Sequence, residues 1–145
     1  AMRGFYRRQG SGLTVAACAA PDGVVREVRD AGQDGRHAFG FVSAEACGVM
    51  TVINPRYTLA VETLQVFLDD FLGSHPDTRI DYIHGDDALA HLGTQPGNIG
   101  FFLPPIDKHA FFTTIVLDGA LPRKTFSMGE ADDKRFYLEC RRIMP

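Results

Sequence analysis

The first third of the chain alternates short apolar runs with turn residues. Four such runs, typical of strands, cover residues 13–19, 24–29, 37–42 and 47–53. Between the first two, Pro21-Asp22-Gly23 predicts a turn, because Pro presets φ and Gly can adopt a positive φ. Strands spaced by about ten residues with turn signals between them favour an antiparallel meander.

The hydrophobic period changes to that of a helix at Leu59. Leu64, Phe67 and Phe71 fall on one helical face, and Gly73 is a natural end for this helix. A short strand is expected at residues 78–83. A small helix capped by Asp86 should follow and run to Gly93.

The last third contains a nearly unbroken apolar run at residues 98–103, which predicts a central strand covered on both faces. A helix at 107–117 and a final strand at 134–143 complete the pattern. Together these elements predict an α+β fold: an antiparallel β-meander, then strand–helix units that form one mixed sheet with helices packed on it. Residues 1–12 should be a flexible lead-in, and residues 13–143 a single domain.

Composition narrows the class of protein. The chain has 145 residues, of which 45% are hydrophobic and 23% charged, as in ordinary globular domains. Its net charge of -3 argues against a nucleic-acid partner, and no apolar run approaches the ~20 residues that span a membrane. Cys18, Cys47 and Cys140 lack metal-ligand spacing, so we expect buried free thiols in a cytoplasmic protein.

The segment 122–129 concentrates groups that bind anions. Arg123 and Lys124 supply cations, and Thr125 and Ser127 supply hydroxyl donors for a phosphate or carboxylate. The segment lacks the order of a Walker A loop. The alternative is a solvated loop whose charges pair with nearby acidic residues, namely Glu130, Asp132 and Asp133. If the loop binds a ligand, Lys124 and Thr125 should lie at the mouth of a cleft.

A second candidate site is His84-Gly85-Asp86-Asp87, between an expected strand and an expected helix. His84, Asp86 and Asp87 could hold a divalent metal or act as an acid–base group. In the simpler interpretation Asp86 caps the helix, Asp87 favours its dipole, and His84 is a turn residue. The residue types point to no particular metal or cofactor.

The carboxyl-terminal segment 119–143 resembles the end of a prokaryotic family known as domain of unknown function 1015. That family ends with a Gly, then Leu-Pro or Met-Pro, then Lys followed by Ser or Thr. The segments 98–105 and 36–40 resemble strands of the same family further upstream. The matching tail positions are Gly119, Leu121, Pro122, Lys124, Thr125 and Ser127.

The resemblance implies that this chain is the carboxyl-terminal part of a longer protein. The amino-terminal part of the family carries an Asp-Gly-His-His-Arg motif that resembles ParB-like nucleotide-binding proteins, some of whose relatives are free-serine kinases. This chain lacks that motif, so no catalytic residue is carried over and the chain alone is expected to be inactive.

Two functional hypotheses follow from the sequence. In the first, the domain completes an anionic, phosphate-bearing small-molecule site of a ParB-like, serine-kinase-related enzyme, with the upstream part of the polypeptide as its partner. In the second, it is a structural or homodimerisation module with no ligand site of its own.

Overall fold

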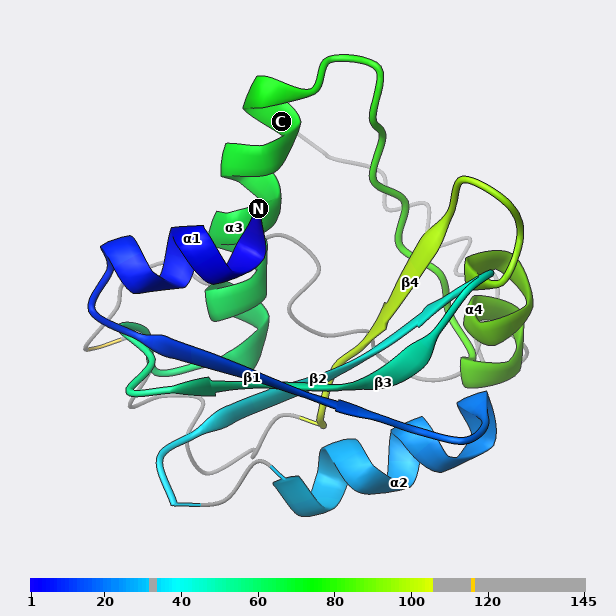
Figure 1. The fold of residues 1–145 in the computed structure, drawn as a ribbon, viewed down its shortest axis with the longest axis horizontal. Coiled ribbons are helices and arrows are strands. Elements are labelled where there is room, and N and C mark those ends of the chain that lie inside the picture. The colour runs from blue at the N-terminus through cyan, green and yellow to red at the C-terminus, as the bar shows by residue number, and fades with distance from the viewer. Residues whose placement is uncertain (32–33, 106–115, 117–145) are drawn as a thin grey trace, which may run out of the picture.

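The computed structural model describes residues 1–31, 34–105 and 116, and this part of the chain has an α+β fold (Figure 1). Helices lie on both faces of a four-stranded sheet. In chain order the elements are α1 (Met2–Arg8), β1 (Gly12–Ala17), α2 (Pro21–Ala31), β2 (His37–Ser43), β3 (Cys47–Ile53), α3 (Ala60–Ser74), α4 (Asp86–Gly93) and β4 (Ile99–Phe102). The α+β class predicted from the sequence is confirmed.

The strand order in the sheet is β1-β3-β2-β4, and each neighbouring pair is antiparallel. β2 and β3 form a hairpin, and β1 pairs with the other side of β3. Consequently β1 and β2 run in the same direction with β3 between them, and α2 connects them. Within the described residues the sheet is therefore antiparallel rather than mixed, its order is not a simple meander, and β4 lies at an edge rather than at the centre.

The segment 24–29, predicted as a strand, is instead part of α2. Pro21 occupies the first helical position, where a missing N–H costs nothing. Val24 and Val28 are four residues apart and both are buried against the sheet. The helix crosses β2 closely at Gly40, where a Cβ atom would collide with the Val24 side chain.

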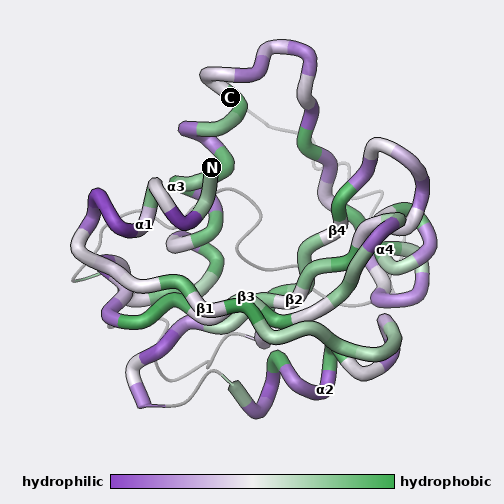
Figure 2. The backbone as a smooth tube through the Cα atoms, viewed as in Figure 1, coloured by the Kyte–Doolittle hydropathy of each residue, from purple (hydrophilic) through white to green (hydrophobic). Residues whose placement is uncertain are grey.

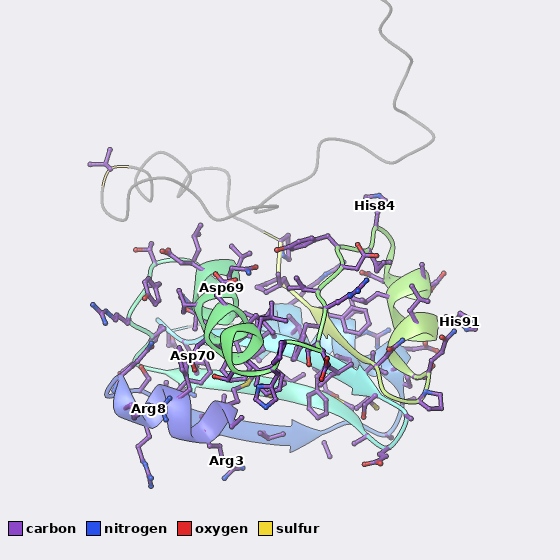
Figure 3. The ribbon with its side chains drawn as sticks, turned by 90° about the horizontal axis from the view of Figure 1, so that it is seen from above. Arg3, Arg8, Asp69, Asp70, His84 and His91 are labelled. Atoms are coloured by element: carbon purple, nitrogen blue, oxygen red, sulfur yellow. The ribbon has the colours of Figure 1, made fainter. Side chains whose placement is uncertain are left out.

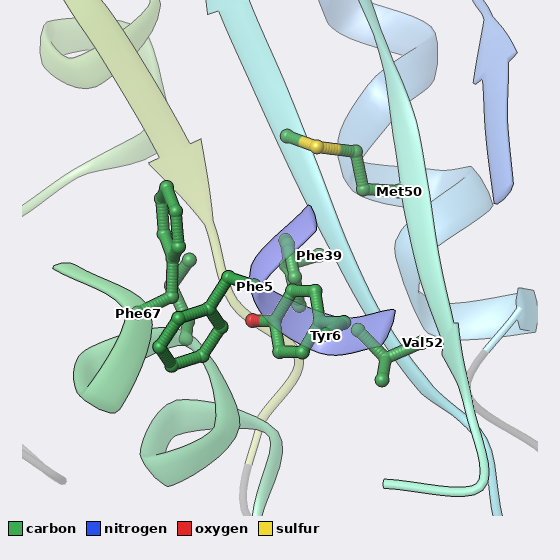
Figure 4. Packing of buried hydrophobic residues seen from close by; sticks show 7 residues of the cluster. Phe5, Tyr6, Phe39, Met50, Val52 and Phe67 are labelled. Atoms are coloured by element: carbon green, nitrogen blue, oxygen red, sulfur yellow. The ribbon is translucent and has the colours of Figure 1, made fainter. Parts of the chain in front are cut away.

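The opposite face of the sheet is covered by α1 and α3 (Figure 1). The sequence predicted a flexible lead-in at residues 1–12. Residues 2–8 of this segment instead form α1, and its Phe5 and Tyr6 are buried. The Phe5 ring meets the Phe67 ring edge to face, with centroids 5.4 Å apart (Figure 4). Phe67 is 6% exposed, as the predicted helix face requires.

The alternation of side chains along β2 divides the core into two layers. Ala38 and Val42 face α2, and Phe39 faces α1 and α3. Figure 2 shows the corresponding apolar stretches along the central strands. This packing explains why both faces of β2 are buried near its middle.

The remaining predicted elements have mixed outcomes. α3 continues one residue beyond Gly73, and residues 78–83 form no strand. The predicted helix at 107–117 lies outside the described residues except for Val116, and the predicted strand at 134–143 lies outside them entirely. None of the helices in the described ranges combines the length and apolar character needed to cross a membrane.

Candidate functional site

The candidate segment His84-Gly85-Asp86-Asp87 leads into α4. Gly85 is the N-cap residue, with φ of 93°, and Asp86 is the first helical residue, so Asp86 is not the cap that the sequence predicted. Asp86 and Asp87 nevertheless lie in the first turn, where carboxylates interact favourably with the helix dipole.

His84, Asp86 and Asp87 are all exposed. Figure 3 shows His84 at the outer edge of the molecule, pointing away from the sheet. Within residues 1–31 and 34–105, no three His, Cys, Asp or Glu side chains gather in a way that could hold a metal ion. The described part of the chain therefore offers no metal centre at this segment.

Asp86 instead joins a pocket built from three elements. α2 contributes one wall, the start of α4 another, and the end of β4 the third. The pocket has a volume of about 200 Å³ and is lined by Val25, Val28, Arg29, Asp86, Phe102, Leu103 and Pro105. Val28 and Phe102 are buried and form an apolar floor, at 2% and 4% exposure.

Two opposite charges lie at this apolar pocket. Arg29 comes from the last turn of α2, and Asp86 from the first turn of α4. The two side chains line the same pocket without forming an ion pair with each other. A guanidinium can bind a carboxylate or phosphate through paired hydrogen bonds, and a carboxylate can accept hydrogen bonds from an ammonium group. The arrangement therefore suits a small molecule that carries both charges and an apolar part.

Sequence reasoning found Asp86 but missed Arg29 and the apolar floor. The reason is the incorrect strand at 24–29, which hid the helical spacing of Val25, Val28 and Arg29. The available signal was Pro21 at a helix start, followed by valines four residues apart.

The segment predicted to bind an anion, with Arg123, Lys124, Thr125 and Ser127, lies outside the described residues. The expectation that Lys124 and Thr125 lie at a cleft therefore stays a prediction.

A polar network lies on the other face of the sheet. The Tyr6 hydroxyl donates to the Thr63 carbonyl at 2.8 Å, and Nδ1 of His37 is 2.8 Å from Oγ1 of Thr63. Burial lowers the pKa of His37, while a hydrogen bond with the backbone of Thr58 acts in the opposite direction. Burial also raises the pKa of Tyr6. Thr63 is 1% exposed and His37 is half-buried, so this network joins α1, α3 and β2 and lies largely in the interior.

Comparisons of the chain with protein-family models, with curated proteins and with solved structures found no match.

Proposed function

We propose that this domain binds a small zwitterionic molecule in the pocket between α2, α4 and β4. The observation that carries the proposal is the presence of Arg29 and Asp86 above a floor of Val28 and Phe102. Binding sites of this kind combine apolar walls with a few polar groups that fix the orientation of the ligand.

The charges and the volume define the class of ligand. An anionic group, either carboxylate or phosphate, binds the guanidinium of Arg29, and an ammonium group binds the carboxylate of Asp86. The space of about 200 Å³ accommodates a compact molecule with a short apolar side chain. A free amino acid or its phosphorylated form has this chemistry.

The pocket proposal does not depend on the resemblance to domain of unknown function 1015, because no family model matches the chain. As a separate proposal from the sequence, Arg123, Lys124, Thr125 and Ser127, which lie outside the described residues, bind a phosphate. In that case the catalytic groups come from an upstream part of the polypeptide.

Binding can be tested by thermal shift and calorimetry with single L-amino acids and phosphoserine. The matching amines and carboxylic acids, which carry only one of the charges, serve as ligand controls. A ligand at about 100 times its Kd stabilises the fold by about 2.7 kcal/mol, which is easily measured. Zwitterions should stabilise the chain, and the singly charged analogues should bind at least about tenfold more weakly, a difference of about 1.4 kcal/mol.

Two variants and two matched controls localise the site. Arg29→Gln and Asp86→Asn remove the charges at the pocket. Arg26→Gln on the same helix and Asp87→Asn on the same turn remove equivalent charges that do not line it. Binding should be lost in Arg29→Gln and Asp86→Asn and retained in the two controls. Equal binding by all four variants, or no binding of any zwitterion, would contradict the proposal.

A second candidate function is self-association through the edge of the sheet, and β1 favours it. β1 pairs with β3 on one side only among the described strands, and it contains neither a charged residue nor a proline. Most of its residues are exposed, and Val15 is 43% exposed. Exposed edges in monomeric proteins are usually protected by charges, prolines or bulges, which this strand lacks.

The expected partner at this edge is a second copy of the chain, paired antiparallel about a two-fold axis. Val15→Lys should convert a dimer to a monomer in light scattering coupled to size exclusion. Leu92→Lys, at a similarly exposed apolar residue on α4, away from β1 and outside the pocket lining, is the control. A monomeric native chain would reject this candidate and leave the pocket proposal unaffected.

A further inference from the structure

Two cysteines far apart in the sequence lie side by side at one end of the sheet. β1 and β3 are paired antiparallel, with Ala17 opposite Gly48. The next residues along the two strands are Cys18 and Cys47, and the Cys18 N–H donates to the Cys47 carbonyl at 3.0 Å. The antiparallel ladder therefore continues by one pair and places the two cysteines directly opposite each other.

The geometry of this pair suits a covalent link. Directly opposite residues of an antiparallel pair have Cα atoms about 4.5–5.5 Å apart, within the range of about 4.4–6.8 Å that disulfides span. Opposite residues also point to the same face of the sheet. Accordingly, both cysteines pack against the same buried cluster under α2, and the Cys47 thiol lies 3.4 Å from the Cys18 carbonyl oxygen.

Both thiols are free and only partly buried, so small oxidants can reach them. This differs from the buried thiols that the sequence predicted. The Cys18 thiol donates a hydrogen bond to Oε2 of Glu27 on α2 at 3.0 Å. Partial burial, this hydrogen bond, the charge of Glu27 and the neighbouring Cys47 raise the pKa of Cys18 to about 11. Cys18 is therefore held as a thiol next to a carboxylate that can accept its proton.

We propose that Cys18 and Cys47 are a redox-sensitive pair that a peroxide converts to a cross-strand disulfide. The Cys47 thiolate attacks hydrogen peroxide, the O–O bond breaks, and Cys47 sulfenic acid and hydroxide are formed. The Cys18 sulfur then attacks the sulfenic sulfur, and its proton passes through Glu27 to the departing oxygen. The S–S bond forms as the S–O bond breaks, and the departing hydroxide takes up this proton and leaves as water. The hydroxide from the first step takes up the proton that Cys47 lost on forming its thiolate, and becomes the second water. Two thiols lose two electrons, and one peroxide becomes two waters.

The link has a structural consequence that can be measured. It joins the edge strand β1 to the central strand β3 and removes the hydrogen bond between Cys18 and Glu27, at the connection that leads into α2. The oxidised chain should therefore resist unfolding better than the reduced chain, because the closed loop restricts the unfolded state.

The experiment uses the full chain with Cys140→Ser, which leaves only the two cysteines of interest, and the unchanged chain in parallel. Each is treated with hydrogen peroxide, and the products are examined by intact mass and by non-reduced peptide mapping. The expected product has lost two hydrogen atoms, contains one peptide linked through residues 18 and 47, and returns to its original mass with dithiothreitol.

Two further variants test which cysteine reacts first. Cys18→Ser should stop the reaction at an oxygenated Cys47. Cys47→Ser should react with peroxide at least about tenfold more slowly, because Cys18 is held as a thiol.

Some outcomes would overturn the inference. One is that both thiols accumulate sulfinic or sulfonic acids without the link. Another is that the dominant disulfide in the unchanged chain includes Cys140. Circular dichroism of each variant shows whether it is folded, and the map of the unchanged chain is decisive even if a variant does not fold.

Discussion

Gly40 of β2 lies directly against Val24 of α2, so closely that a Cβ atom at position 40 would overlap the valine side chain. Val28 and Phe102 close the same space, at 3.0 Å and 3.3 Å from that position. The pocket wall formed by α2 and the end of β4 therefore depends on a residue without a side chain.

Gly40→Ala should destabilise the fold by about 1–3 kcal/mol, because the extra methyl group must displace Val24 from a packed interface. Urea unfolding measures the change in the free energy of unfolding. Gly23→Ala is the control, since it adds the same methyl group to α2, where the closest atom is Oε1 of Glu27 at 4.0 Å. The control should be neutral or stabilising, because Ala favours a helix. Similar losses in both variants would argue against the close contact.

Phe67→Ala should cost about 3–5 kcal/mol, because Phe67 is 6% exposed and contacts the rings of Phe5 and Tyr6. The measurement is again the free energy of unfolding in urea. Leu92→Ala, at 37% exposure on α4, should cost far less. A loss below about 1 kcal/mol for Phe67→Ala would contradict the packing of α1 on α3.

His37 should make the fold sensitive to acid. Its pKa is lowered by burial in the folded chain, whereas the unfolded chain titrates near the ordinary value of about 6.5. Between that value and the lower folded pKa, the unfolded state binds more protons, so stability is lost as the pH falls through this window.

His37→Gln retains a polar group next to Thr63 and removes the titration. The free energy of unfolding of the native chain should decrease below about pH 6.5, by at most about 1.4 kcal/mol per pH unit from this group. The variant should show a smaller slope over the same range. Parallel curves for the two proteins would show that His37 is not responsible. His91→Gln, on the exposed side of α4, is the control and should keep the native slope.

The chain alone is expected to show no kinase, phosphatase or hydrolase turnover, as the sequence indicated. The measurement is an assay of the purified chain with nucleotides and phosphorylated amino acids. Turnover that a single substitution in this chain abolishes would contradict this expectation.

Some elements were determined by local sequence alone. The strands predicted at 37–42 and 47–53 correspond to β2 and β3, and the helix predicted from Leu59 to Gly73 corresponds to α3. The two strands were marked by short apolar runs bounded by turn residues, and the helix by apolar residues that recur at the helical period, so neighbouring residues carried enough information. The acidic first turn of α4 was equally visible in the sequence.

Other features were decided only by tertiary contacts. The residues of α1 carry little helical signal, and the helix is stabilised by burial of Phe5 and Tyr6 against α3. The segment 24–29 has a pattern compatible with either a strand or a helix, and its contact with Gly40 and Val42 selects the helix.

The order of the strands also depends on tertiary contacts. β3 is inserted between β1 and β2, which brings Cys18 to Cys47, and this requires pairing between strands distant in sequence. The pocket at Arg29 and Asp86 likewise requires residues 57 positions apart to meet, and local periodicity cannot encode such a meeting because it is fixed by the packing of whole elements.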